Sequence, residues 1–314
     1  MVNPLFTNGV IAVKERLLLG EKLLRFTELS VEEVLRACKE SGFGGVEAED
    51  GEELVEGEER VLDDFIREYA PTQAEKVYLL APRDFHNAKA LCKAKLLGAS
   101  AEKLLAPEGL IPVEVISAAI ESGEYAGLGK ELGGAVQAAL ETEELTGAQV
   151  GALFDIALYR HLSAVCRFHP RLKKLLAGRA DRTNILTAVR ASGDRDLAET
   201  LYVSGGKLAA KDLSGIFDEN AERAEHALDK KPCADFYKLC LSAREKAPLT
   251  EAERALESYE AEYFQARRYE LEGKEPFLYY VFRRRAEIQN VRIILVCLNA
   301  GLSAQDIKKR LRAI

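Results

Sequence analysis

The sequence predicts an all-α protein made of three similar helical domains. Helix-forming residues are abundant, and the 314 residues include only nine prolines and no tryptophan. The alternation of apolar and polar residues that marks a strand is almost absent, and only residues 42–49 and 201–203 leave room for one. A single pattern also recurs about every hundred residues, and a period this long indicates a triplicated domain, not a solenoid.

The recurring pattern is an acid, two variable residues and an asparagine, followed by an apolar helical stretch that runs into a glycine. The acid, the asparagine and the glycine of the three copies are Asp84, Asn87 and Gly98; Asp181, Asn184 and Gly193; and Glu287, Asn290 and Gly301. After the glycine, similar strings begin at Gly109, Gly206 and Gly301. These matches predict domains at residues 1–122, 123–219 and 220–314. No Pro/Ser-rich linker separates them, so we expect them to pack together.

Capping and breaking residues predict where individual helices begin. Ser30 and Glu33 form a capping box that opens a helix, and Thr250 and Glu253 form another. Pro276 suits the first turn of a helix, which we expect to extend over residues 277–300. Loops are predicted where Gly and Pro gather, at residues 42–51, around 71, and at 98–112, 123–134, 170–180, 193–206 and 230–232.

The acid and the asparagine of each copy share one stripe of a helix, because they are three residues apart. The rest of the stripe is apolar, so we expect both side chains to point inward. A buried polar group without a hydrogen bond costs about 1–3 kcal/mol, and each should therefore reach a backbone terminus or a neighbouring unit. Pro82 and Gly178 precede the first two acids, which are candidate N-caps. The trailing glycines suit the left-handed residue that closes a helix.

The sequence predicts no catalytic, cofactor-binding or metal site. The acids are spread one to a domain and each has an asparagine beside it, which favours structural roles over acid–base catalysis. None of the four histidines forms an H-x-x-x-H pair, and the Gly-rich strings near Gly44 and Gly206 lack P-loop spacing. Arg283, Arg284 and Arg285 are interpreted as a solvated or salt-bridged helix face.

Composition excludes several classes of protein. Hydrophobic residues make up 47% and charged residues 30% of the chain, which is typical of a soluble globular protein. The net charge of −7 argues against nucleic-acid binding. No two of the six cysteines have C-x-x-C spacing, so buried thiols are expected. No signal peptide is visible, and the apolar run at residues 293–298 is too short to span a membrane.

The third copy carries a family resemblance. The strings at residues 273–280 and 286–295 resemble the C-terminal signature of the C/d subunit family of V-type ATPases, the central-stalk rotor cap. The segments at 84–87 and 181–190 look like further motifs of that family. The resemblance covers essentially the whole chain. The motif residues on which it rests are Asp84, Asn87, Asp181, Asn184, Arg190, Glu287, Asn290 and Arg292.

The resemblance implies a helical funnel of three domains around a pseudo-threefold axis, without catalytic site or cofactor. Such a protein sits on the cytoplasmic side of the membrane, touching it only through protein partners. It caps the membrane rotor ring, holds the foot of the central stalk and transmits torque for ion transport. Two alternatives remain. A helical scaffold unrelated to rotary ATPases would not retrieve ring and stalk subunits, and a helical enzyme would show a closed pocket with convergent titratable groups.

Overall fold

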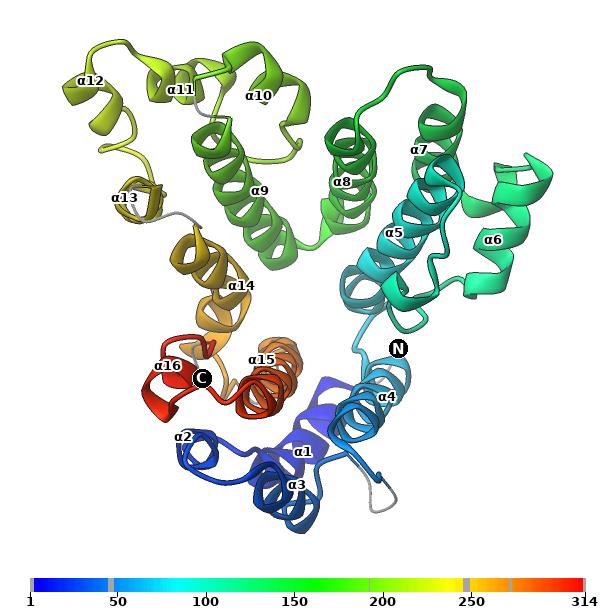
Figure 1. Cartoon of the computed structure of the whole chain (residues 1–314), viewed down its shortest axis with the longest axis vertical. Coiled ribbons are helices and arrows are strands. Elements are labelled where there is room, and N and C mark those ends of the chain that lie inside the picture. The colour runs from blue at the N-terminus through cyan, green and yellow to red at the C-terminus, as the bar shows by residue number, and fades with distance from the viewer. Residues whose placement is uncertain (1–2, 45–47, 192, 245–248, 271–272, 313–314) are drawn as a thin grey trace. The chain divides into compact units, whose positions relative to one another are not determined.

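The computed structural model describes the chain except residues 1–2, 45–47, 192, 245–248, 271–272 and 313–314. Within those described ranges every regular element is a helix and none is a strand, which confirms the all-α prediction (Figure 1). Residues 201–203 form no strand, nor do the described parts of 42–49, whose residues 45–47 lie outside the described set. Among the described helices, none combines the length and the apolar character needed to cross a bilayer.

The chain divides into two compact units, Met1–Lys76 with Glu257–Ile314, and Val77–Leu256. Two helices, α5 (Gln73–Leu97) and α14 (Thr250–Gln265), pass from one unit into the other. The division into domains at 1–122, 123–219 and 220–314 stays a prediction.

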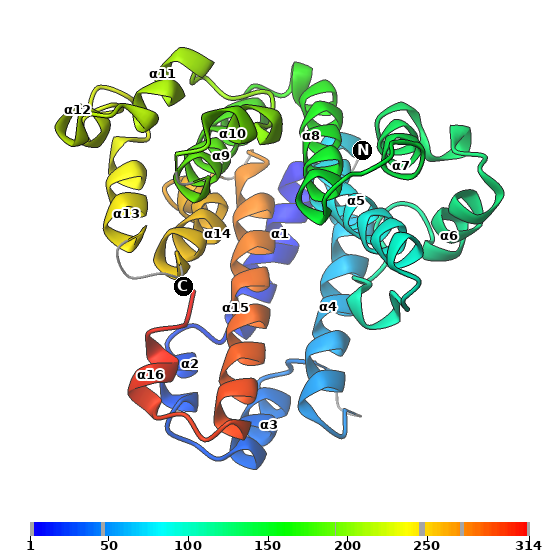
Figure 2. The same ribbon diagram turned by 45° about the horizontal axis from the view of Figure 1, so that its top comes forward.

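The first unit is built around α15 (Glu275–Asn299), which confirms the long helix predicted over residues 277–300. Figure 2 shows α15 running alongside α1 and α4. The other helices of this unit are α1 (Pro4–Lys14), α2 (Lys22–Phe26), α3 (Val31–Glu40), α4 (Gly51–Tyr69) and α16 (Ala304–Lys308), with a 3-10 turn η1 (Glu15–Leu17). Ser30 and Glu33 make the predicted capping box at the start of α3, and the Asp50 side chain caps α4.

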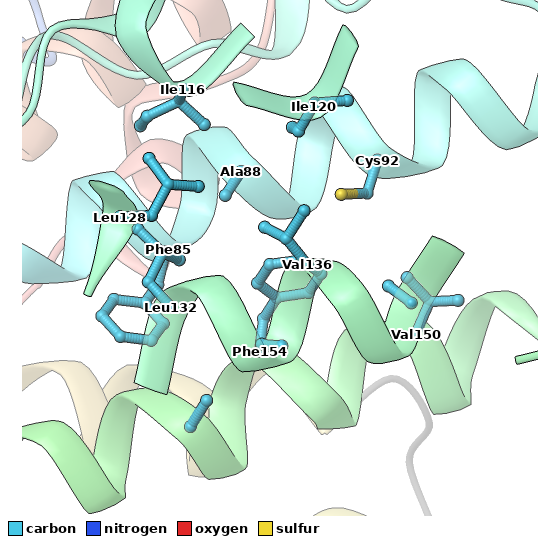
Figure 3. Close-up of a cluster of buried hydrophobic side chains, with 13 residues drawn as sticks. Phe85, Ala88, Cys92, Ile116, Ile120, Leu128, Leu132, Val136, Val150 and Phe154 are labelled. Atoms are coloured by element: carbon cyan, nitrogen blue, oxygen red, sulfur yellow. The ribbon is translucent and has the colours of Figure 1, made fainter. Parts of the chain in front are cut away.

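The second unit holds two hydrophobic cores. Its remaining elements are α6 (Val113–Ser122), α7 (Lys130–Glu141), α8 (Gly147–Val165), α9 (Pro170–Arg190), α10 (Arg195–Leu201), α11 (Ala210–Ser214), α12 (Ala221–Glu225) and α13 (Ala234–Arg244), with 3-10 turns η2 (Glu102–Leu104), η3 (Ala126–Leu128), η4 (Cys166–Phe168) and η5 (Gly215–Phe217). One core joins α5, α6, α7 and α8 around Phe85, Val136 and Phe154 (Figure 3). The other joins α9, α11, α13 and α14 around Ile185 and Tyr237.

The loop predicted at residues 170–180 is wrong, because α9 runs without interruption through it, and the loop predicted at 193–206 is interrupted by α10. Pro170 occupies the first helical position, where a missing N–H costs nothing. Leu175 and Leu176 are buried and hold the helix together across Gly178. The glycine closures are confirmed at Gly98 and Gly301, whose φ angles are +62° and +71°.

Candidate functional site

Each motif acid is buried well inside a long helix. The exposed fractions are 3% for Asp84 in α5, 4% for Asp181 in α9 and 0% for Glu287 in α15. The proposed N-cap roles of Asp84 and Asp181 are therefore wrong. α5 begins at Gln73 and continues through Pro82, and α9 begins at Pro170, so both acids lie at least two turns inside their helices.

The first two acids accept backbone N–H groups from a loop that follows much later in the chain. Asp84 Oδ1 accepts from Leu110 at 2.9 Å and from Ile111 at 3.1 Å. Asp181 Oδ1 accepts in the same way from Lys207 at 2.7 Å and Leu208 at 2.9 Å. We call such an acid with its two consecutive N–H donors an acid clamp. Hydrogen bonds to a charged acceptor are about twice as strong as neutral ones, so each clamp fixes its loop firmly to its helix.

The third acid clamp uses donors from a segment that lies far upstream in the chain. Glu287 accepts from Gly20 N at 2.8 Å and from Leu19 N at 3.2 Å. In the other two copies the donors follow the acid, whereas here they precede it. The segment before α2 therefore takes the place of the downstream loop that serves Asp84 and Asp181.

Each motif asparagine forms two hydrogen bonds to the backbone of a single residue, one to its C=O and one to its N–H. Asn87 donates to Ala106 O at 3.1 Å and accepts from Ala106 N at 2.7 Å. The same two bonds join Asn184 to Val203 at 2.9 and 2.8 Å, and Asn290 to Arg312 at 3.2 and 2.7 Å. All three side-chain amides are buried, and the two hydrogen bonds satisfy both the oxygen and the nitrogen of each.

A glycine precedes the donors in the two aspartate clamps, and the geometry requires it. A Cβ at Gly109 or Gly206 would collide with the carboxylate oxygen of Asp84 or Asp181. In the third clamp the corresponding position is Leu18, and the acid is a glutamate.

Glu287 also belongs to a buried ionic network that the sequence did not reveal. Arg284 lies between two carboxylates, with Nε 2.6 Å from Glu58 Oε1 and Nη1 3.0 Å from Glu287 Oε2. It also donates to Leu17 O at 3.2 Å, and Glu58 accepts from Gly44 N at 2.8 Å. Of the two interpretations of Arg283–Arg285, a solvated or a salt-bridged face, Arg284 confirms the salt bridge, but it is buried at 3% exposure and lies on no solvated face.

The two carboxylates of this network hold Arg284 in its charged form. Burial acts to lower the pKa of Arg284, but the two carboxylates Glu58 and Glu287 outweigh it, and the pKa is raised. A buried ion pair stabilises a fold only when its remaining polar atoms are also bonded, and backbone groups meet that need here.

Arg190 and Arg292, the two motif arginines, lie at the surface. Arg190 pairs with Glu253, and Arg292 Nη2 lies 3.2 Å from Glu59 Oε1. Their side chains are 51% and 43% exposed, and such pairs contribute at most about 1 kcal/mol. The eight motif residues therefore lie along three helices, α5, α9 and α15, and each acid and asparagine bonds a backbone segment of its own.

The cysteines and histidines give no further candidate among the residues that the structure describes. All six cysteines are buried thiols, and burial raises the pKa of Cys38, Cys92 and Cys240 to about 12. In the part of the chain that the structure describes, no cluster of His, Cys, Asp and Glu is suited to a metal ion. Burial also lowers the pKa of His161, which lies beside Phe85 in the first core.

An open pocket of about 790 Å³ lies in the second unit near η5 and α13. Part of its apolar surface comes from Ile216, Phe217 and Tyr237. The lining also includes acidic residues and Lys238, whose Nζ lies 3.0 Å from a carboxylate oxygen of Asp229. Among the residues that line it there is no histidine or cysteine that could act as a nucleophile or general base.

Comparisons with known proteins agree with the resemblance seen in the sequence. The model of the family described as ATP synthase (C/AC39) subunit matches residues 9–310. The chain is similar to the C subunit of the V-type ATP synthase of Thermus thermophilus, with 28% identity over 219 residues that cover 64% of this chain and 67% of the relative. It is also similar to the C subunit of the V-type sodium ATPase of Enterococcus hirae, with 25% identity over 277 residues that cover 84% and 83%.

The family match includes all three acid clamps and nearly all of both compact units. Two relatives from different organisms are both named as the C subunit of a V-type complex. The predicted resemblance is therefore confirmed, and the chain belongs to the ATP synthase (C/AC39) subunit family, which includes the C subunits of V-type ATPases.

Proposed function

We propose that this chain is a non-catalytic central-stalk subunit of a V-type ATPase or ATP synthase. It caps the membrane rotor ring, receives the foot of the central stalk, and transmits torque between them for ion transport. The observation that carries the proposal is the acid clamp, which recurs in each of three long helices in a chain of this family.

The three acid clamps support an internal triplication. In every copy an acid three residues before an asparagine binds two consecutive N–H groups, and the asparagine pairs with one backbone residue. We infer three domains at residues 1–122, 123–219 and 220–314, arranged as a funnel about a pseudo-threefold axis. Leu19 and Gly20 belong to the first domain but complete the third. Three similar domains around an axis would offer a stalk contacts on all sides.

The clamps also suit a part that transmits torque. Such a part must resist deformation, and a buried polar network with every member bonded makes a structure rigid. Each carboxylate ties a loop to a helix by two charge-assisted bonds, and Arg284 adds a further tie between α15 and α4 through Glu58.

The same bonds argue against catalysis by the motif acids. A general base needs a free lone pair within reach of a substrate, whereas these carboxylates are buried and already accept from the backbone. We infer a position on the cytoplasmic side of the membrane, with contacts to it only through protein partners. The partners are the ring and stalk subunits, and no nucleic acid or cofactor takes part.

Reconstitution tests the proposal. Membrane ring and central stalk from the same organism are purified without this chain, and each is mixed with it. We expect the chain to bind both, to join them into one particle, and to restore ATP-driven ion transport in vesicles. We also expect no nucleotide hydrolysis by the chain alone. Binding to neither partner, or a hydrolase activity that one substitution in this chain abolishes, would contradict the proposal.

A further inference from the structure

A strongly basic corner joins α8 to α9 in the second unit (Figure 1). No acid occurs between Asp155 and Asp181, although the chain as a whole has a net charge of −7. The cations of this stretch are Arg160, Arg167, Arg171, Lys173, Lys174 and Arg179. We call residues 167–174 the basic corner, because four of these cations lie within it.

An exposed aromatic ring stands in the basic corner. Phe168 is 82% exposed, more than any other large hydrophobic side chain among the described residues. The 3-10 turn Cys166–Phe168 produces this exposure, because it buries Cys166 completely and leaves Phe168 outside. The Arg167 guanidinium lies over the ring, 5.3 Å from its centroid, so the cation and the apolar surface are presented together.

The dipole of α9 does not account for these cations. The N-terminal end of a helix carries partial positive charge and favours acids, yet the first turn of α9 holds no acid and the first two turns hold Arg171, Lys173 and Lys174. Arg167 and Lys174 form no ion pair with any residue that the structure describes. A patch that is unfavourable for its own helix suits a partner of opposite charge.

We propose that the basic corner binds a carboxylate-rich surface of a protein partner, with Phe168 as its apolar anchor. The inference rests on the proposed function, which makes the partner another member of the same rotary complex. An arginine fork matches a carboxylate geometrically, and aromatic and Arg residues are enriched at the energetic centres of protein interfaces.

The test compares variants with matched controls from the same unit. The variants are Phe168→Ala and the double change Arg167→Glu with Lys174→Glu. The controls are Leu104→Ala, whose side chain is 60% exposed, and Lys103→Glu beside it. The Kd of each protein is measured separately for the detergent-solubilised ring and for the stalk subunits. Circular dichroism establishes that each variant is folded.

We expect Phe168→Ala to weaken binding to one of the two partners by about tenfold or more. The charge reversal should weaken the same binding and remove most of its dependence on ionic strength, measured between about 0.01 and 0.15 M. The two controls should leave the Kd unchanged.

Other outcomes overturn the inference in distinguishable ways. If the wild type binds ring and stalk and neither variant changes either Kd, the basic corner is no docking site, while the proposed function stands. If the wild type binds neither partner, the proposed function fails and the inference with it. Vesicles of phosphatidylserine, compared with phosphatidylcholine, complete the test. Phosphatidylserine binding that the variants abolish, with no change toward the protein partners, would assign the corner to lipid.

Discussion

A methyl group at Gly109 tests the acid clamp of Asp84 directly. The backbone of Gly109 does not have a positive φ, so alanine is allowed there by its own conformation. Its Cβ would nevertheless overlap the Asp84 carboxylate and lie 2.7 Å from the carbonyl oxygen of Leu80. The carbonyl belongs to the backbone of α5 and cannot move aside, so the loop that carries Leu110 and Ile111 must move away.

The magnitude follows from the bonds that this movement breaks. Asp84 loses the N–H groups of Leu110 and Ile111, and a hydrogen bond to a charged group contributes about 1.5–3 kcal/mol. Two such bonds amount to about 3–6 kcal/mol. Alanine lowers the conformational entropy of the unfolded chain, which offsets this loss of stability by about 0.4–1 kcal/mol. We expect Gly109→Ala to destabilise the clamped loop by about 2–5 kcal/mol.

Amide hydrogen exchange measures this loss where it occurs. Exchange at Leu110 and Ile111 should accelerate roughly 25-fold or more, because every 1.4 kcal/mol changes an opening equilibrium tenfold. The control is Gly134→Ala on the exposed side of α7, where an added Cβ meets nothing within 4 Å outside its own turn of helix. That control should stabilise α7 by up to about 1 kcal/mol. Unchanged exchange at Leu110 and Ile111 in Gly109→Ala would refute the reasoning.

Three further predictions concern other buried groups. Asn184→Leu should lower the free energy of unfolding by about 1–3 kcal/mol, because both backbone groups of Val203 lose their partner; an unchanged urea midpoint would exclude this. Arg284→Met should cost about 3–5 kcal/mol by leaving two buried carboxylates without a cation, again measured in urea. Burial raises the pKa of Cys38 and Cys92 to about 12, so a thiol reagent at pH 8 should modify neither in the native protein. Since the unfolded thiols titrate near 9, their contribution to stability should fall as the pH rises from about 9 to 12 in a denaturation series.

The helical elements were predictable where local signals agreed. The helix around Glu287 was found because Pro276 suits its first turn and Gly301 closes it. The error at residues 170–180 arose because Pro and Gly were both interpreted as breakers. In the structure Pro170 begins α9, and buried leucines support the helix through Gly178.

The candidate site was predictable only in part. The apolar stripe placed Asp84 correctly in the interior, because helical spacing is a local property. Its partner Leu110 lies 26 residues away in a loop, and no periodicity connects a helix to such a loop. The burial of Arg284 was missed for a related reason: three consecutive arginines suit a solvated or salt-bridged face, and only the position of Glu58 on another helix shows that one of them is buried.

The bond between Glu287 and the segment before α2 imposes an order on folding during synthesis. The partners of Asp84 and Asp181 follow them by no more than 27 positions, so both contacts can form soon after each loop leaves the ribosome. Leu19 and Gly20 are separated from Glu287 by 268 and 267 positions. Leu19 and Gly20 therefore leave the ribosome long before Glu287, and their bonds to it can form only after the intervening chain has been synthesised. Contacts this distant in sequence also form slowly. A nascent chain stopped before Glu287 would therefore hold its two earlier loops in place while the segment around Leu19 stays undocked.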